Sequence, residues 1–288
     1  GSGELWPDRQ LPSRRCPGWV IDWGCRTWLM GVINVTPDSF SDGGRFDRPQ
    51  AAVRQARRLL EAGVDVLDLG AQSTRPGAVA CTAEQEWQRL APVLEAIQAA
   101  FPLALLSVDT FHPAVAELAL AAGAHWLNNV RGTTDDAMLP LVAASGCPYV
   151  LMHSRGTSDS MDQLASYGDV VLEVRDALRA ASERALAMGV RASQLIWDPG
   201  LGFAKTTAHN LALLRRLEVL VAEGYPLLVG ASRKRFIGEL LQQPKPMARI
   251  WGTAAIGVQA IAKGARILRV HDGAAMVQTA RMADALWR

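Results

Sequence analysis

The amino-acid sequence predicts an α/β protein, a (β/α)8 TIM barrel with a short N-terminal hairpin arm. Short apolar stretches alternate with longer amphipathic stretches through roughly eight repeats of the pattern. Nearly every apolar stretch ends in a small polar cluster, and a barrel collects such strand ends on one face. The alternative architecture is a doubly wound open sheet. It is disfavoured because no Gly-x-Gly-x-x-Gly fingerprint follows the first strand.

The first half of the chain contains the arm and four strand-plus-helix units. Residues 11–24 are rich in Pro and Trp, and an alternating piece at 19–23 predicts the hairpin arm. Apolar runs that end at polar residues or at glycine predict strands at 27–33, 64–69, 103–108 and 126–130. Amphipathic runs predict helices at 51–62, 82–100, 113–122 and 138–145, with Thr82 as the cap of the second.

The second half completes the barrel with four more strands. They are expected at 148–152, 194–197, 226–229 and 265–270, and helices are expected at 169–188, 209–222 and 273–287. A long loop covers 157–166, and residues 230–234 open a further helix. The sequence has no internal repeat, low-complexity tract or linker, so residues 5–288 are expected to form a single domain. Residues 1–4 resemble a disordered cloning scar.

The composition narrows the class of partner and the compartment. The 30 basic residues are nearly balanced by 28 acidic ones, which disfavours nucleic acid as the main partner. No apolar run approaches the roughly 18 to 20 residues of a membrane helix, and the amino terminus lacks a signal-peptide segment. The four cysteines form no Cys-x-x-Cys pair, which is typical of reduced thiols, although a Cys16–Cys25 disulfide is an alternative. We therefore expect a cytoplasmic protein that binds neither membranes nor nucleic acid.

The loop after the first expected strand is rich in oxygen donors. The strand stops at Asn34, whose amide oxygen can bind a hard cation. The further donors are Thr36, Asp38, Ser39 and Ser41. The alternative is a hydrogen-bonded turn followed by a capped helix.

Basic residues follow the seventh and eighth expected strands. Ser232 stands with free backbone N–H groups before a helix, which makes a natural anion site beside two basic residues. Alternation along the eighth strand places Arg269 and His271 on the same side, and an Arg fork with an imidazole suits a diphosphate. The alternatives are that Ser232 is only an N-cap and that Arg269 pairs with Asp272.

Three other strand ends carry polar groups that can point inward together, namely Asp109, Asn128 and Asp198. Two carboxylates and an amide suit the edge of an aminopyrimidinone, whose adjacent N–H and NH2 donors a carboxylate accepts in bidentate fashion. The alternative is that each caps its own loop. A zinc site is not expected because no two histidines have metal-ligand spacing, and no Ser or Cys nucleophile signature is present.

Seven motifs occur in order along the chain, and together they are far more specific than any one alone. They are Met-Gly-Val-Ile-Asn-Val-Thr-Pro-Asp-Ser-Phe-Ser-Asp-Gly-Gly at 30–44, Ser-Thr-Arg-Pro-Gly-Ala at 73–78, Ser-Val-Asp-Thr at 107–110, Leu-Met-His at 151–153, Asp-Pro-Gly-Leu-Gly-Phe-Ala-Lys at 198–205, Gly-Ala-Ser-Arg-Lys at 230–234 and Arg-Val-His-Asp at 269–272. This ordered set resembles the dihydropteroate synthase family of folate biosynthesis, from Met30 to the end of the chain.

The resemblance implies a transferase activity and its partners. The family joins 4-aminobenzoate to a 7,8-dihydropterin methyl diphosphate and releases pyrophosphate, with Mg²⁺ as cofactor. Sulfonamides target this family. The implied partners are the two small-molecule substrates and, because the family is typically homodimeric, a second copy of the chain.

The resemblance also assigns roles to individual residues. The catalytic residues would be Asp109, Asp198 and Lys234. The pterin would be bound by Asp109, Asn128, Met152, Asp198, Lys234 and Arg269. The diphosphate would be bound by Asn34, Arg269 and His271, with Mg²⁺ on Asn34. The aminobenzoate would be bound by Thr74, Arg75, Pro76, Phe203 and Ser232.

Two positions depart from the usual bacterial pattern of the family. Gln72 stands where Glu is common, and Asn129 stands where Asp is common. Each difference removes a negative charge but keeps the size and one acceptor. These two departures leave open a non-catalytic pterin-binding paralogue. A barrel of the methyltetrahydrofolate methyltransferase kind, on a related scaffold, is a further alternative.

Overall fold

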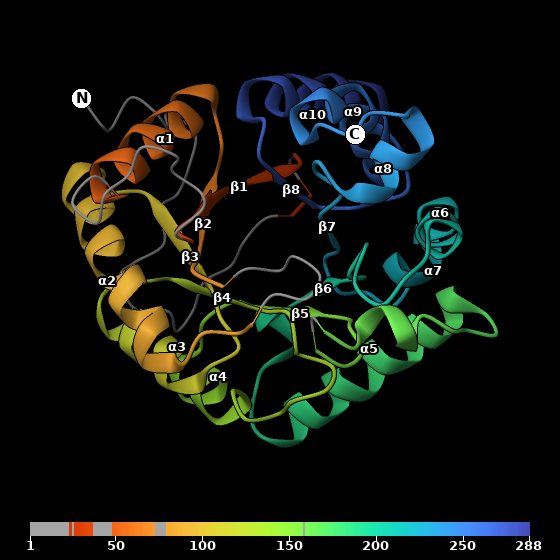
Figure 1. Cartoon of the computed structure of the whole chain (residues 1–288). Coiled ribbons are helices and arrows are strands. Elements are labelled where there is room, and N and C mark those ends of the chain that lie inside the picture. The colour runs from red at the N-terminus through yellow and green to blue at the C-terminus, as the bar shows by residue number, and fades with distance from the viewer. Residues whose placement is uncertain (1–22, 25, 37–47, 73–78, 158) are drawn as a thin grey trace.

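A ring of eight parallel strands forms the centre of the molecule, and helices surround it (Figure 1). The computed structural model describes residues 23–24, 26–36, 48–72, 79–157 and 159–288. The strands are β1 (Trp28–Asn34), β2 (Val66–Gly70), β3 (Leu105–Asp109), β4 (Trp126–Asn129), β5 (Tyr149–Met152), β6 (Leu195–Asp198), β7 (Leu228–Val229) and β8 (Ile267–Val270). They pair in the order β6-β5-β4-β3-β2-β1-β8-β7, and a parallel bridge between Trp197 and Leu227 joins β6 to the start of β7. The predicted (β/α)8 class is confirmed, whereas the predicted arm lies mostly outside the described residues.

The helices follow the strands as the sequence pattern predicts. They are α1 (Arg48–Ala62), α2 (Ala83–Ala100), α3 (Pro113–Ala121), α4 (Leu139–Ser145), α5 (Val170–Ala187), α6 (Thr207–Arg215), α7 (Leu217–Val221), α8 (Arg235–Leu241), α9 (Ile250–Ala262) and α10 (Gly273–Trp287). Thr82 caps α2 in a reciprocal pair with Gln85, as predicted. In the described ranges, no helix is long and apolar enough to cross a membrane.

Two helical regions differ from the prediction. The single helix expected at 209–222 is split into α6 and α7, because the backbone leaves helical geometry at Arg216, with φ −124° and ψ 32°. Helix α9 was not predicted, since glycine within an apolar run is usually a break signal. Here Gly257 permits close packing: a Cβ atom at this position would lie 2.8 Å from Met276 Cε of α10.

An apolar layer closes the amino-terminal end of the barrel. Each strand contributes one side chain to it, namely Met30, Val66, Leu105, Trp126, Val150, Ile196, Leu228 and Ile267. Trp23 and Trp28 cover this layer, with the Trp28 and Trp126 rings stacked at a centroid distance of 6.2 Å. Burial of this layer removes water from one end of the barrel, so that a ligand must enter from the other.

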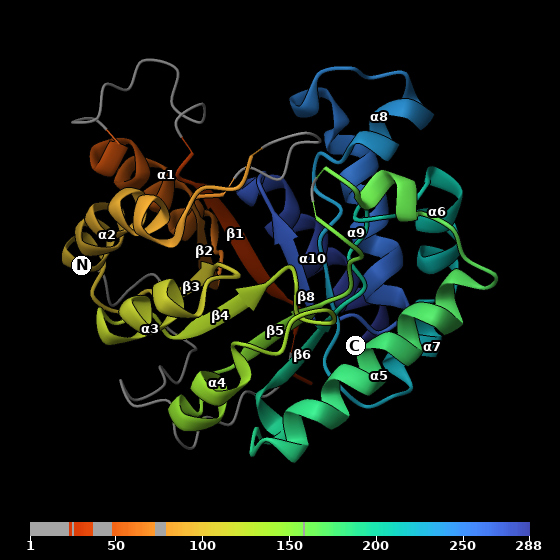
Figure 2. The ribbon, with the colours of Figure 1, turned by 60° about the horizontal axis from the view of Figure 1, so that its bottom comes forward.

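The opposite faces of the strands form a second and larger core with the helices. Leu67 and Leu69 of β2 alternate with the inward residues and pack into this outer core. All strands run parallel, so their carboxyl ends lie on one side of the barrel (Figure 2). This geometry gathers the polar strand ends at a single mouth.

Candidate active site

The interior of the barrel becomes polar two residues beyond the apolar layer. Because side chains alternate along a strand, the next inward layer consists of Val32, Asp68, Ser107, Asn128, Met152, Asp198, Gly230 and Arg269. A further step of two residues adds Asn34, Asp109, Ser232 and His271. A cavity of about 570 Å³ opens above this floor at the carboxyl end of the barrel.

The cavity brings together every predicted site residue that the structure describes. These are Asn34, Asp109, Asn128, Met152, Asp198, Phe203, Ser232, Lys234, Arg269 and His271. Strand register explains part of this convergence, because Asn34 pairs with Gly70, Gly70 with Asp109, and Asp109 with Asn128. The predicted residues Thr74, Arg75 and Pro76 lie outside the described residues.

Arg269 lies between two carboxylates on the floor of the cavity. Its Nε donates to Asp68 Oδ2 at 2.9 Å, and its Nη2 is 3.6 Å from Asp109 Oδ2. Burial raises the pKa of Asp109 to about 7, and the Asp68 charge adds to this rise, whereas Arg269 opposes it. Asp68 and Asp109 therefore share the Arg269 cation, and the Asp109 carboxyl titrates near neutral pH.

Asp198 and Lys234 form a second charged pair across the cavity. Burial raises the pKa of Asp198, and the nearby Lys234 charge opposes this rise. Burial likewise lowers the pKa of Lys234 to about 8. Lys234 Nζ donates to Leu201 O at 2.5 Å and lies 5.1 Å from the centroid of the Phe203 ring. The ammonium is thus held beside an aromatic wall, with its charge close to that of Asp198.

Ser232 and His271 meet at the third edge of the cavity. The backbone N–H of His271 donates to Ser232 Oγ at 3.0 Å, and His271 Nδ1 lies 2.8 Å from the same oxygen. Burial, and then the Arg269 charge, lower the pKa of His271 to about 3, so the imidazole is neutral. If Nδ1 accepts from the hydroxyl, Nε2 carries the proton and can donate to an anion.

Two alternatives left open for this edge are excluded by the structure. Ser232 is not a helix cap: α8 begins at Arg235, and its N-cap is Lys234, without a capping side-chain bond. Nor does Arg269 pair with Asp272. Arg233 forms that pair instead, with Nη2 to Oδ1 at 2.7 Å and Nε to Oδ2 at 3.2 Å. Arg269 is therefore directed toward the floor of the cavity.

Asn34 is the predicted ligand for Mg²⁺. Its Oδ1 accepts a hydrogen bond from the backbone of Thr36 at 3.1 Å, which orients the amide at the cavity rim. Within the described ranges, no group of three or more His, Cys, Asp or Glu side chains could cage a metal ion. One neutral oxygen fits Mg²⁺, which is usually bound by few protein ligands together with substrate phosphates and water.

Sequence reasoning missed two residues that support the site. Asp68 lies inside an apolar strand, and a charged residue there must have a partner, which was the available signal. Lys205 is also buried, and its Nζ lies 2.8 Å from His153 Nδ1 while donating to Gly200 O at 3.0 Å and Phe203 O at 2.9 Å. Lys205 thus fixes the loop that carries Phe203 to the cavity wall.

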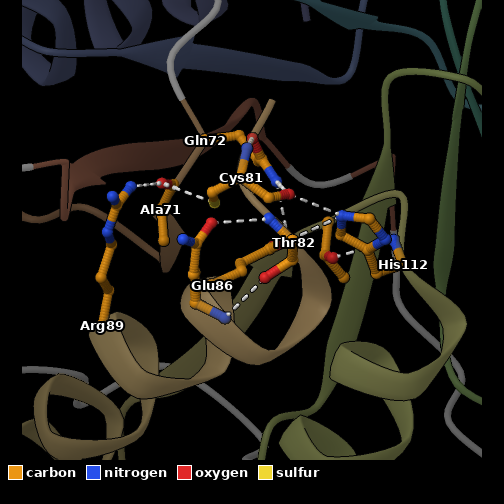
Figure 3. Close-up of polar contacts among 9 residues, drawn as sticks. Ala71, Gln72, Cys81, Thr82, Glu86, Arg89 and His112 are labelled. Carbon is orange, nitrogen blue, oxygen red and sulfur yellow. Dashed lines mark hydrogen bonds and ion pairs between the residues drawn. The ribbon is translucent and has the colours of Figure 1, made fainter. Parts of the chain in front are cut away.

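The environment of Gln72 explains its departure from the family pattern (Figure 3). Its Nε2 donates to Cys81 O at 3.0 Å and to Glu86 Oε2 at 3.1 Å, while its Oε1 accepts from Cys81 N at 3.0 Å. Glu86 is fully buried, and this burial raises its pKa. An amide suits this position because its NH2 group donates to both acceptors, whereas an ionised carboxylate has no proton to donate. Gln72 also ties together the two ends of the segment that contains the Ser-Thr-Arg-Pro motif.

The variant Gln72→Glu is expected to be less stable than the parent by about 1–3 kcal/mol at pH 8. It loses both donor bonds and places a second carboxylate beside Glu86. At pH 5 the difference should shrink, because protonation of either raised-pKa carboxyl removes the repulsion. Urea unfolding at both pH values measures this. Gln85→Glu is the matched control, because Gln85 is an exposed residue of α2 and the new carboxylate can still accept the capping bond. Equal destabilisation at both pH values would contradict the explanation.

Asn129, the second departure, lies behind the barrel wall. Its neighbour Asn128 faces the cavity, so Asn129 faces the outer core. Its Nδ2 donates to Tyr149 Oη at 2.9 Å, and its Oδ1 accepts from the backbone N–H of Arg131 at 3.0 Å. Both amide atoms are therefore used in packing, and the departure does not change the charge of the cavity lining.

Known proteins match this chain over most of its length. Residues 30–271 match the family described as pterin binding enzyme. The chain is 46% identical over 270 residues to the dihydropteroate synthase of Synechocystis, with 93% of each chain covered. It is 40% identical to the Escherichia coli dihydropteroate synthase, covering 89% of this chain and 90% of the other.

Solved structures agree as well. The structure of Xanthomonas albilineans dihydropteroate synthase with 4-aminobenzoic acid matches with a TM-score of 0.87 and 43% identity, covering 94% of this chain and 96% of the other. The same enzyme in complex with 7,8-dihydropteroate matches with a TM-score of 0.84 and 40% identity, covering 94% and 97%. The chain therefore belongs to the pterin-binding enzyme family, among the dihydropteroate synthases.

Proposed function

We propose that this chain condenses a (7,8-dihydropterin-6-yl)methyl diphosphate with 4-aminobenzoate to give 7,8-dihydropteroate and pyrophosphate. One observation carries the proposal: a single cavity combines the carboxylates and amide of Asp109, Asp198 and Asn128 with the cations and imidazole of Lys234, Arg269 and His271. The carboxylates and the amide suit the donor-rich edge of a pterin, and Arg269 with His271 suits a diphosphate. Both halves of the first substrate are thereby recognised in one place.

The pterin would bind on the floor of the cavity. The Asp198 carboxylate would accept from the amino and ring N–H donors, and Asn128 Oδ1, which has no partner in the described part of the chain, would accept from a neighbouring edge. Lys234 would donate to the ring carbonyl, and Met152 would pack against the ring. Asp109 is placed to stabilise positive charge as the C–O bond breaks.

The diphosphate would bind where Arg269, His271 and Asn34 meet. A guanidinium and a neutral imidazole N–H provide donors to the leaving oxygens. When bound, Mg²⁺ would rest on Asn34 and offset the charge of the departing pyrophosphate. Arg269 and His271 hold the leaving group with their own hydrogen bonds.

The aminobenzoate would approach from the Ser232 and Phe203 side. Phe203 offers an aromatic wall, and the Ser232 hydroxyl is placed to meet the carboxylate. Thr74, Arg75 and Pro76 are proposed to complete this subsite. Attack of the aniline nitrogen forms the C–N bond as the C–O bond breaks, the electron pair leaves with pyrophosphate, and the aniline proton passes to solvent. Positioning and charge stabilisation carry this reaction without a covalent enzyme intermediate.

Pyrophosphate release from the dihydropterin methyl diphosphate, with and without 4-aminobenzoate, tests the proposal. We expect release that depends on 4-aminobenzoate and Mg²⁺, with dihydropteroate formed in equal amount. Tight pterin binding without turnover would instead establish the non-catalytic alternative. Reverting Gln72 and Asn129 to Glu and Asp would then show whether these departures cause the loss.

We further propose that the chain acts as a homodimer in the cytoplasm. The wide spacing of its cysteines suits a reducing compartment. Large apolar side chains are exposed on α9 and α10, including Trp251, Met282, Leu286 and Trp287, and Trp251 is 81% exposed. Sedimentation equilibrium should therefore give twice the mass of the chain, and a monomer at micromolar concentration would contradict this proposal.

A further inference from the structure

One carboxylate beneath the cavity, that of Asp68, has no role in the chemistry proposed above. Asp68 lies in β2 and is 0% exposed. Its Oδ2 accepts from Asn128 Nδ2 at 3.2 Å and from Arg269 Nε at 2.9 Å, and its Oδ1 accepts from Ser107 Oγ at 2.7 Å. The carboxylate therefore joins side chains from β3, β4 and β8 behind the surface that a substrate would touch.

The bond to Asn128 decides which atom of that amide faces the cavity. An amide side chain can be turned over at little cost unless a neighbour distinguishes its oxygen from its nitrogen. The Asp68 carboxylate can only accept, so it holds Nδ2 and directs Oδ1 away from itself. Asn128 Oδ1 is buried and has no partner in the described ranges, while Asn128 lines the cavity. A buried acceptor of this kind is satisfied when a ligand donates to it.

The bond to Arg269 orients a second site residue. Asp68 takes the Nε donor, so the two terminal nitrogens of the guanidinium are directed onward, with Nη2 at 3.6 Å from Asp109 Oδ2. A guanidinium held by Nε keeps the remaining N–H groups for an anion. The Asp68 carboxylate thus orients both Asn128 Oδ1, the proposed acceptor for the pterin ring, and the terminal N–H groups of Arg269, the proposed donors to the diphosphate.

We propose that Asp68 is a positioning residue for substrate binding, which fixes Asn128 as an acceptor toward the pterin ring and Arg269 as a donor toward the diphosphate. The inference rests on the proposed function and deepens it. Asp68 itself would touch neither substrate. Its contribution would appear in the affinity for the pterin diphosphate and not in the affinity for 4-aminobenzoate.

Calorimetric binding of the dihydropterin methyl diphosphate to Asp68→Asn tests the proposal. We expect affinity to fall by about 10- to 100-fold, because charge-assisted bonds that orient two contacts are lost. The KM for 4-aminobenzoate should change by less than about twofold. Pterin affinity within twofold of the parent would overturn the inference, as would equal losses for both substrates.

Asp65→Asn is the matched control. Asp65 precedes the same strand, is also 0% exposed, and pairs with Arg26 at 2.8 Å while accepting from Leu29 N at 2.8 Å. It lies at the amino end of the barrel, away from the cavity. We expect this variant to lose stability but to keep its pterin affinity, so that a general effect of removing a buried charge is separated from positioning.

A double-mutant cycle tests whether Asp68 acts through Asn128. In an Asn128→Ala background the acceptor is already gone, so Asp68→Asn should cost less pterin affinity than it does in the parent. Fully additive losses would overturn that part of the inference. Affinity is measurable without turnover, so failure of this inference is distinct from failure of the proposed function, which would appear as a parent chain that makes no dihydropteroate.

The pH dependence of kcat/KM provides a second test, because a purely structural role of Asp68 would leave it unchanged. The Asp109 carboxyl faces Asp68, Glu86 and Asp198, whose charges raise its pKa, and Arg269, whose charge lowers it. Removing the Asp68 charge lowers the pKa of Asp109 and leaves Arg269 to pair with it. The acid limb of kcat/KM should therefore move to lower pH in Asp68→Asn. An unchanged limb would overturn the positioning role.

Discussion

Asp198→Asn is expected to lower kcat/KM by about 100- to 10,000-fold. Two charge-assisted bonds to the pterin edge, each worth about 1.5–3 kcal/mol, would be lost, and the new NH2 group would oppose the donors of the ring. The substitution also affects Lys234. Burial lowers the pKa of this lysine, and the Asp198 charge partly offsets that decrease. Without that charge the pKa of Lys234 falls below about 8, so a larger fraction of the lysine is neutral at neutral pH. One substitution therefore removes one charge of the pair and weakens the other.

Steady-state pyrophosphate release and calorimetric pterin binding measure this loss together. The control is Asp284→Asn, which removes a largely buried carboxylate that accepts from the backbone and hydroxyl of Thr27 at the amino end of the barrel. That variant should lose stability and keep its KM for the pterin substrate. Pterin affinity near that of the parent in Asp198→Asn would contradict the assignment of Asp198 to the ring.

The barrel could be predicted because its alternating pattern is local. Each buried strand shows as an apolar run and each helix as an amphipathic one, and the strand that ends at Asn34 was placed within one residue of β1. Where glycine serves packing, as Gly257 does, the same local signal predicts a break, and α9 was missed. No local signal in the sequence marks the kink at Arg216.

The residues that line the cavity could likewise be predicted, but their hydrogen-bond partners could not. A strand end identifies Arg269 as an inward residue, whereas its pairing with Asp68 depends on the register of β8, β1 and β2. Sequence adjacency left Asp272 open as an alternative partner of Arg269, but Asp272 pairs with Arg233. Ser232 contacts His271 because the two residues follow β7 and β8, which are neighbours in the barrel. This contact also depends on how the strands pair and not on the local sequence.

Arg269→Ala is the second change with a large expected effect. It removes the guanidinium from the proposed diphosphate site and leaves Asp68 and Asp109 as neighbouring acids without their shared cation. Affinity for the dihydropterin methyl diphosphate should fall by more than about 100-fold, whereas affinity for the bare hydroxymethyl pterin should fall far less. Calorimetry with both ligands measures the difference. Equal losses would contradict the diphosphate role, and Arg26→Ala, which disturbs the ion pair with Asp65 at the other end of the barrel, is the control.

The pH profile of Arg269→Ala should move in the opposite direction to that of Asp68→Asn. Arg269 lowers the pKa of Asp109, so its removal raises that pKa above about 7 and protonates Asp109 in the neutral range. Ionised Asp109 is proposed to stabilise positive charge as the C–O bond breaks. Activity in Arg269→Ala should therefore begin to fall at a higher pH than in the parent, because Asp109 is protonated at a higher pH. The acid limb should therefore shift up in Arg269→Ala and down in Asp68→Asn. Movement of both limbs in one direction would show that Asp109 does not control the acid limb, because Asp68 and Arg269 act on its pKa in opposite directions.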